Sequence, residues 1–128
     1  MESINQLEYG EIRIADEVIV TIAGFAATEI KGVSGMSGGF VDDIVEILGK
    51  KNLSKGVKVD ILDNGIAIDL YLIVDYGIKI PDIAWEIQDN VKTTLECMLN
   101  MNVHDVNIHI QGVNFAKEIP QDELKLRN

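Results

Sequence analysis

The segment KGVSGMSGGF at residues 31–40 is the first place in the chain where residue type and spacing suggest ligand chemistry. Four of its ten residues are glycines and a predicted helix follows, an arrangement in which backbone N–H groups bind phosphate. The recognised phosphate-binding patterns, G-x-x-x-x-G-K-[ST] and G-x-G-x-x-G, are absent from it. The next helix also begins with Asp42 and Asp43, whose carboxylates would repel an anion. We therefore interpret the segment as a turn of the chain, with Gly32 ending the preceding helix.

Two acidic residues on neighbouring predicted strands form a second candidate site. The strands at 57–62 and 66–74 alternate apolar and polar residues, and the Asn-Gly pair at 64–65 predicts a two-residue hairpin loop between them. That register places Asp60 directly opposite Asp69. Paired carboxylates can bind a metal ion or work as an acid and a base, but no histidine or further acid in these strands completes such a set. We favour a charge repulsion tolerated in solvent.

The two histidines and the single cysteine are the remaining residues with catalytic or metal-binding chemistry. A predicted strand at 104–113 places His104 and His109 on opposite faces, where they cannot share a metal ion. Neither Cys97 nor any serine has a base near it in a recognisable arrangement. The sequence therefore predicts no catalytic, cofactor-binding or metal-binding residue, and it predicts a protein that is not an enzyme.

Composition limits the environment and the partners of the protein. The chain has 128 residues, with 11 Lys+Arg against 21 Asp+Glu and a formal net charge of −10. Such a balance disfavours nucleic acid and anionic membrane surfaces, since both recruit clustered basic residues. One cysteine cannot form an internal disulfide, and no run approaches the roughly 18 apolar residues that cross a bilayer. We expect a cytoplasmic protein of one domain that does not insert into membranes.

Hydrophobic periodicity predicts two longer helices. The first follows a strand at 10–15 and runs from residue 17 to residue 31, with Asp16 as its N-cap. The second runs from residue 80 to residue 99 and carries Pro81 in its first turn. The residues predicted to face the core are Val18, Ile19, Ile22, Ala26 and Ile30 in the first helix, and Ala84, Ile87, Val91, Leu95 and Met98 in the second.

The order of predicted elements indicates an α+β fold. A mainly antiparallel sheet has the two longer helices packed on one face in a split βαβ-like arrangement, and one short helix at 40–48 is added. We divide the chain into a flexible N-terminus at 1–8, a single domain at 9–115 and a mobile C-terminal tail at 116–128.

Five segments, taken in order, resemble the alkaline shock protein family of Gram-positive bacteria, also called the Gls-type general stress family. They are GEIRIADEVI, IKGVSGM, KGVKVDI, LYLIVDYGIKIPDIAWEIQDNVK and VHDVNIHIQGVNF. The resemblance covers residues 9–115 and implies a non-enzymatic cytoplasmic protein linked to cell-envelope stress. It also implies self-assembly, contact with the membrane through a membrane-anchored partner, or control of acetyl-CoA carboxylase and fatty acid synthesis.

Two groups of residues are our candidate interaction sites. Trp85, the only tryptophan, projects from the predicted outer face of the second helix together with Asp89 and Lys92. It either marks an interface or is covered by the C-terminal tail. The second group is basic, and it is either a solvated helix end or an interface patch; it consists of Lys50, Lys51, Lys55 and Lys58.

Two hypotheses of different classes follow. In the first, the protein is a scaffold that forms homo-oligomers, with an acidic helix face near Asp42, Asp43 and Glu46 meeting the basic patch of a second copy. In the second, it is a regulatory module that binds an enzyme of lipid synthesis through Trp85 and the surrounding helix face.

Overall fold

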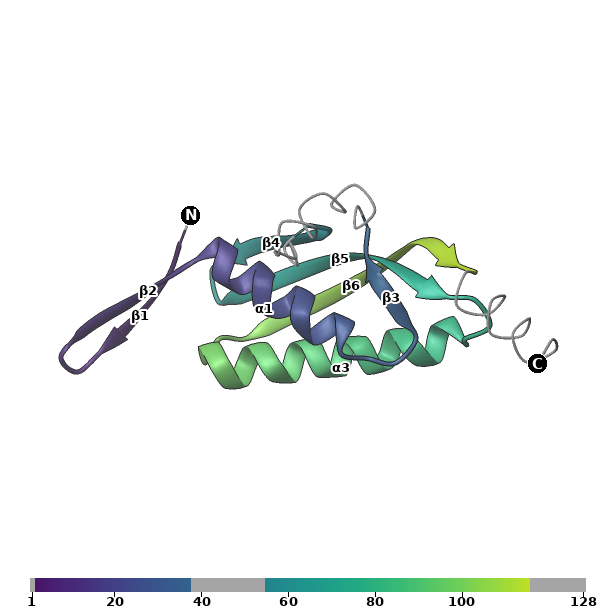
Figure 1. The fold of residues 1–128 in the computed structure, drawn as a ribbon. Helices are drawn as coiled ribbons and strands as arrows, with labels where there is room; N and C mark the ends of the chain where they lie inside the picture. The colour runs from purple at the N-terminus through teal and green to yellow at the C-terminus, as the bar shows by residue number, and fades with distance from the viewer. Residues whose placement is uncertain (1, 38–54, 116–128) are drawn as a thin grey trace, which may run out of the picture.

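The computed structural model describes residues 2–37 and 55–115, in which two helices cover one face of a sheet (Figure 1). This arrangement confirms the predicted α+β class. The short helix predicted at 40–48 lies outside the described residues. The described elements are β1 (Glu2–Leu7), β2 (Gly10–Ala15), α1 (Asp16–Thr28), β3 (Val33–Met36), β4 (Val57–Leu62), β5 (Gly65–Asp75), α3 (Ile80–Leu99) and β6 (Val103–Asn114).

Strand β5 is the centre of the main sheet. Strand β6 pairs with it in parallel from Ile66 to Asp75. The other edge of β5 is shared by two antiparallel partners, β4 along its first half and β3 along its second half. Helix α3 connects the parallel pair, so β5, α3 and β6 form a βαβ unit whose two strands are direct neighbours.

The core lies between this sheet and the two helices. Alternate residues of β5 are fully buried and face the helices, while the residues between them face the opposite side. Helix α3 buries residues spaced by four, and α1 packs against it through alanines that allow a close approach. The buried residues of α3 are Ile83, Ile87, Val91, Leu95 and Leu99.

The predicted bounds of α3 are confirmed, and its predicted inward face is partly wrong. Ile87, Val91 and Leu95 are buried as expected, but Ala84 is only half-buried and Met98 is 64% exposed. Ile83 and Leu99 take their places. The buried residues follow one row of i, i+4 positions, which is inclined to the helix axis. Met98 comes three positions after Leu95 rather than four, so it lies off this row and outside the contact with the core.

Helix α1 differs from its prediction at both ends and on its inner face. It begins at Asp16, which is therefore a helical residue, and Ala15 occupies the N-cap position. It ends at Thr28, three residues before the predicted end. Val18, predicted to face the core, is 45% exposed, while Ala23 and Ala27 are fully buried. Ile19 and Ala26 are buried as predicted, so α1 packs on the domain through Ile19 and the small alanines.

The glycine-rich segment leads from α1 into the sheet. Gly32 has a φ of +108°, and a Cβ atom there would lie 2.9 Å from the side chain of Ile83. The following residues form β3, in which Met36 is buried and Val33 packs partly buried against the core. Both side chains thus lie toward the core. Gly38 and Gly39 lie outside the described residues.

The hairpin of β4 and β5 has a register two residues away from the predicted one. Its loop is Asp63-Asn64, because Gly65 already pairs with Leu62. Gly65 belongs to the strand because its backbone lies against the start of β6, and a Cβ atom there would be 2.5 Å from the carbonyl oxygen of Asn102. A shift of two keeps each side chain on its predicted face.

This register overturns the predicted opposition of Asp60 and Asp69. Asp60 pairs with Ala67, and the residue opposite Asp69 is Lys58. The like-charge pair of the predicted register is thus replaced by two opposite charges on neighbouring strands.

The N-terminal residues form a separate two-stranded sheet. Strands β1 and β2 pair antiparallel from Glu2–Ala15 to Leu7–Gly10, and their hairpin projects beyond the start of α1 (Figure 1). Strand β1 lies within residues 1–8, the segment expected to be flexible. Strand β2 itself is predicted correctly, but it belongs to this hairpin and not to the main sheet.

Candidate functional site

The face of the sheet turned away from the helices carries a cluster of polar and aromatic side chains, Lys58, Asp69, Tyr71 and His109. The rings of Tyr71 and His109 stack with centroids 4.4 Å apart and an angle of 9° between their planes. His109 Nε2 lies 3.2 Å from Asp69 Oδ1, and Lys58 Nζ lies 5.7 Å from the centre of the Tyr71 ring. Three neighbouring strands thus supply one connected group, and we name it the open-face cluster.

The open-face cluster combines a carboxylate–imidazole contact with a cation beside an aromatic ring. Its one carboxylate already contacts the imidazole, and its cation lies over an aromatic ring. No group of three His, Cys, Asp or Glu residues in the described part of the chain could hold a metal ion. The cluster places both charges and an aromatic ring on the same face of the sheet.

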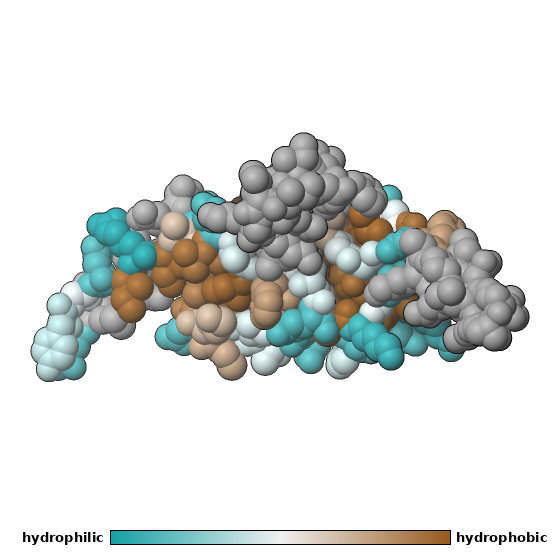
Figure 2. All heavy atoms as spheres, in the orientation of Figure 1, coloured by the Kyte–Doolittle hydropathy of each residue, from teal (hydrophilic) through white to brown (hydrophobic). Residues whose placement is uncertain are grey.

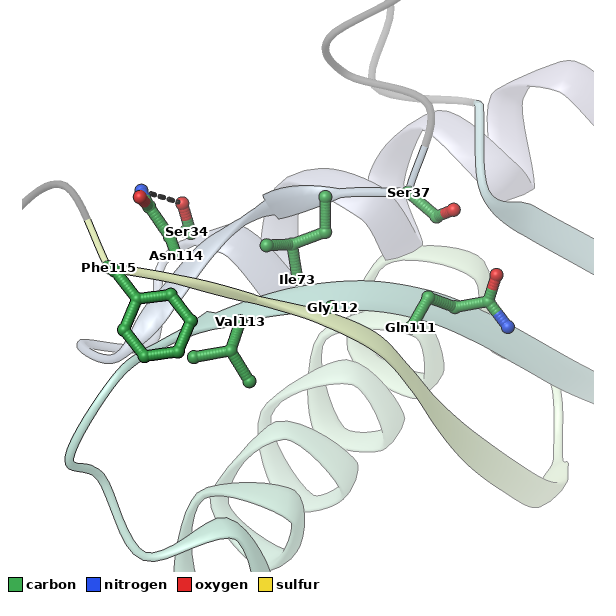
Figure 3. A pocket seen from close by; sticks show the side chains of 8 residues that line it. All are labelled: Ser34, Ser37, Ile73, Gln111, Gly112, Val113, Asn114 and Phe115. Atoms are coloured by element: carbon green, nitrogen blue, oxygen red, sulfur yellow. Dashed lines mark hydrogen bonds between the residues drawn. The ribbon is translucent and has the colours of Figure 1, made fainter.

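A shallow pocket of about 320 Å³ lies farther along the same sheet (Figure 3). Ile73 provides apolar surface, and the amide of Asn114 donates a 2.8 Å hydrogen bond to Ser34 Oγ. The volume is at the low end for a small-molecule site. The described lining residues carry no titratable side chain and so supply no acid or base; they are Ser34, Ser37, Ile73, Gln111, Gly112, Val113, Asn114 and Phe115.

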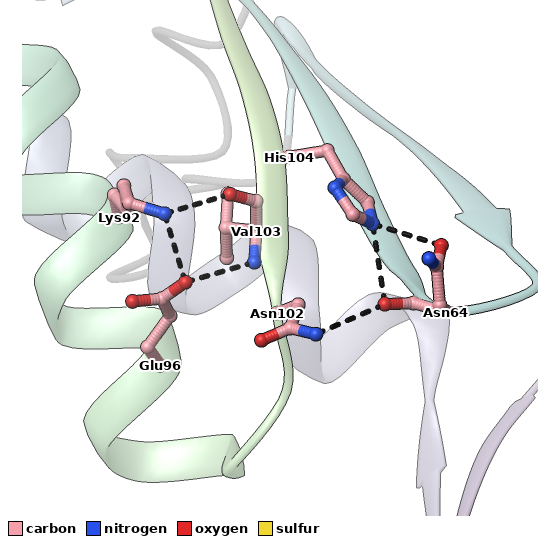
Figure 4. Close-up of polar contacts among 6 residues, drawn as sticks. All are labelled: Asn64, Lys92, Glu96, Asn102, Val103 and His104. Carbon is pink, nitrogen blue, oxygen red and sulfur yellow. Dashed lines mark hydrogen bonds and ion pairs between the residues drawn. The ribbon is translucent and has the colours of Figure 1, made fainter.

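The start of strand β6 is closed on its outer edge by side chains of α3 (Figure 4). Glu96 Oε2 accepts hydrogen bonds from the Val103 N–H at 3.0 Å and from Lys92 Nζ at 2.9 Å. Lys92 Nζ also donates to the Val103 carbonyl at 2.9 Å. The backbone hydrogen bond from Val103, followed by that from Lys92, lowers the pKa of Glu96. Backbone groups that a neighbouring strand would otherwise use are therefore occupied.

A second set of contacts joins the hairpin loop of β4 and β5 to the residues at the start of β6. His104 Nε2 lies 3.0 Å from Asn64 Oδ1 and 3.2 Å from the Asn64 carbonyl, and Asn102 donates to that carbonyl at 3.2 Å. His104 thus has a different set of partners from His109. These contacts help to hold the hairpin loop against the start of β6. Gly65 lies at this point, where a Cβ atom would come too close to Asn102.

The predicted interaction residues on α3 have different surroundings. Trp85 is 64% exposed, and Asp89 is exposed on the same helix. Lys92 is committed to Glu96 and Val103. The alternative that the tail covers Trp85 concerns residues 116–128, which lie outside the described residues.

The predicted basic patch is only partly described. Lys58 belongs to the open-face cluster, and Lys55 is exposed in the turn before β4. Lys50 and Lys51 lie outside the described residues, as do Asp42, Asp43 and Glu46. The open face of the sheet and the outer side of α3 are separate surfaces, so the structure does not bring Lys58 together with Trp85.

Sequence reasoning missed an apolar surface on the outer side of α1. Val18 is 45% exposed and Phe25 is 55% exposed, and Ile12 of the neighbouring hairpin is 46% exposed. In Figure 2, brown hydrophobic surface gathers where α1 begins, beside the base of the hairpin. The signal was present in the sequence, because the run from Val18 to Thr28 contains no charged residue. Of these residues, Val18 is predicted to face the core, and Phe25 is not among the residues assigned to that face.

Comparison with known proteins shows the family. Residues 4–115 match the model of the alkaline shock protein 23 family, described as having a cell envelope-related function. The chain belongs to this family, as the five segments predicted. It is 46% identical over 117 residues to the uncharacterized protein YqhY of Bacillus subtilis, covering 89% of this chain and 87% of that one.

A more distant relative agrees with this assignment. A stress response regulator gls24 homolog of Streptococcus pyogenes is 23% identical over 120 residues, covering 93% of this chain and 67% of that one. Among solved structures, MamM CTD C267S aligns with a TM-score of 0.47 and 14% identity, covering 76% of this chain and 95% of that one. None of the described helices is long and apolar enough to cross a membrane.

Proposed function

We propose that this protein is a non-enzymatic interaction module of the cell-envelope stress response that works by associating with copies of itself. Membership of an envelope-related family with stress-regulator relatives supports the setting. The described pocket lining, which lacks any acid, base or nucleophilic thiol, supports a role without catalysis. A cytoplasmic protein with a net charge of −10 would reach an anionic membrane through a protein partner rather than through lipid contact.

The observation that carries self-association is the N-terminal hairpin. Strands β1 and β2 pair only with each other among the described strands. An isolated two-stranded hairpin is marginally stable in water and needs a third strand or a packing surface to persist. The exposed Ile12 on β2 provides apolar surface for such packing. A second copy, bringing its own exposed surface, would supply what the hairpin lacks.

Sedimentation velocity of the purified full chain over a wide concentration range tests this proposal. We expect the weight-average sedimentation coefficient to rise with concentration toward that of a dimer or a larger assembly. A chain that sediments as a monomer over the whole range would contradict the proposal. Deleting residues 1–9 is expected to weaken the association, because it removes one strand of the hairpin.

A further inference from the structure

Helix α1 is apolar on two opposite sides, and the described part of its own domain covers only one of them. Ala23, Ala26 and Ala27 are at most 1% exposed and pack on the core. On the other side, Val18, Thr21 and Phe25 are all exposed and follow the i, i+3, i+7 spacing of a helix–helix contact. A helix that is apolar around its whole circumference is typical of a buried helix. The outer side of α1 therefore has the composition of a covered surface.

We propose that this outer side of α1 packs antiparallel against the same helix of a second copy, forming a dimer with two-fold symmetry. The inference rests on the proposed self-association and assigns its surface and geometry. Its contact residues are Val18, Thr21, Phe25 and, on the hairpin, Ile12. In such a dimer both copies contribute the same patch of residues. Each contact between residue i of one copy and residue j of the other therefore occurs twice.

The spacing of the exposed residues fits a two-fold axis. Val18 lies three positions before Thr21, and Phe25 lies four positions after it. When two antiparallel helices cross near Thr21, Val18 of each copy meets Phe25 of the other. Thr21 then lies beside its own symmetry mate, where its small side chain permits a close approach. A patch with this pattern is complementary to itself.

Charges at the two ends of α1 favour a second copy in the antiparallel orientation. Arg13 is exposed on β2, before the helix begins, and pairs with Glu11 of its own chain at 2.9 Å, while Glu29 is exposed at the C-cap and accepts a hydrogen bond from Asn90. An antiparallel pair places Arg13 of each copy near Glu29 of the other, where the guanidinium has enough N–H donors to contact a second carboxylate. A parallel pair would instead place the acidic first turns, Asp16 and Glu17, side by side. Exposed ion pairs contribute little energy, so they select the orientation while the apolar residues supply the affinity.

The hairpin gains a surface in the same arrangement. It projects beyond the N-terminal end of α1 (Figure 1), so in an antiparallel dimer it runs past the C-terminal end of the α1 helix of the other copy. Ile12 would there be covered by the second copy. One symmetric interface thus accounts for both the exposed helix face and the hairpin.

A pair of matched charge substitutions tests the surface by sedimentation equilibrium. Phe25→Glu introduces two carboxylates into the proposed interface, and we expect the dissociation constant of the dimer to rise at least about 100-fold. Trp85→Glu changes an equally exposed aromatic residue on α3, and we expect a change of less than about threefold. Circular dichroism of each variant establishes that the domain is folded. If Trp85→Glu dissociates the dimer and Phe25→Glu does not, this inference is overturned and self-association stands.

Disulfide cross-linking tests the geometry without disrupting the surface. In a Cys97→Ser background, Thr21→Cys places one thiol per copy beside the two-fold axis, where Cβ atoms come within disulfide range. We expect oxidation to yield a covalent dimer from Thr21→Cys and none from a Trp85→Cys control. Absence of the Thr21 cross-link in a sample that sediments as a dimer contradicts the antiparallel packing. A parent chain that is monomeric at every concentration contradicts both this inference and the proposed function.

Discussion

The carboxylate of Glu96 accepts the backbone N–H of Val103, and in doing so it joins the last turns of α3 to the first residue of β6. Lys92 completes the contact from one turn earlier in the helix. The first residue of an edge strand would otherwise present an unpaired donor and acceptor to solvent or to another chain. Lys92, which the sequence places on the outer face of the second predicted helix, thus helps to hold the start of β6 against α3.

Replacing Glu96 by glutamine should lower stability at neutral pH more than at acid pH. The backbone contact with Val103, and then Lys92, holds the pKa of Glu96 below its ordinary value of 4.5. A group with a lowered folded-state pKa stabilises the fold above its unfolded-state pKa, and the effect is lost as the pH falls through the folded-state value. Urea midpoints of parent and Glu96→Gln at pH 7 and pH 3.5 measure this. Glu86→Gln, at an exposed position of the same helix, is the control. An equal loss for Glu96→Gln at both pH values would contradict the prediction.

Alanine at Gly65 should destabilise the domain by about 1 to 3 kcal/mol. The added Cβ atom would lie 2.5 Å from the Asn102 carbonyl oxygen, at a residue whose φ is +157°. The matched control is Gly35→Ala in β3, where no heavy atom lies within 4 Å of the new Cβ atom. We expect that substitution to change the free energy of unfolding by less than about 0.5 kcal/mol. Equal effects of the two substitutions in urea unfolding would contradict the close approach at Gly65.

Leu95 and Met98 are both apolar residues in the last turns of α3, but truncating them to alanine should reduce the free energy of unfolding by very different amounts. Leu95 is fully buried, so Leu95→Ala is expected to reduce the free energy of unfolding by about 2 to 5 kcal/mol. Met98 is 64% exposed, so Met98→Ala is expected to cost less than about 0.5 kcal/mol. Chemical denaturation followed by circular dichroism separates these values. A large loss in the free energy of unfolding for Met98→Ala would instead support the sequence-based prediction that Met98 faces the core.

Trp85 offers a direct optical test of the outer side of α3. As the only tryptophan, it should show emission typical of a water-exposed indole and strong quenching by acrylamide. A chain shortened to residue 115 should give the same quenching constant if the tail leaves Trp85 uncovered. An increase in quenching on truncation would favour the alternative in which the tail covers it.

The same residue tests the second functional hypothesis. If the outer side of α3 binds an enzyme of lipid synthesis, a tagged chain carrying Trp85→Ala should lose that enzyme from a pull-down that the parent chain supports. Recovery of identical partners by parent and variant would remove this surface from the regulatory hypothesis.

Local signals in the sequence were sufficient for some elements of the fold. Pro81 and a sustained helical period predicted both ends of α3. The loop of the β4 and β5 hairpin was predicted one residue too late, which shifts the strand register by two, because its position depends on a contact between Gly65 and Asn102, 37 residues later in the chain. Hairpin propensity carries no information about such a contact.

The surfaces were harder to predict for a related reason. An apolar residue of a helix predicts burial but does not say by which chain, so Val18 was assigned to the core of its own domain. The open-face cluster depends on a parallel pairing that brings His109 beside Tyr71 across β5 and β6, which no local pattern indicates. The direction of the strands followed from the structure alone.

The dependence of self-association on salt tests the central claim most directly. Sedimentation equilibrium of the full chain should be measured at about 0.05 M and about 1 M sodium chloride, where the screening length falls from more than 10 Å to about 3 Å. Since the proposed interface is mainly apolar and each copy carries a net charge of −10, we predict a dimer whose affinity at high salt equals or exceeds that at low salt. Dissociation at high salt would instead favour contact between the basic patch and an acidic surface. A monomer at both salt concentrations would contradict self-association altogether.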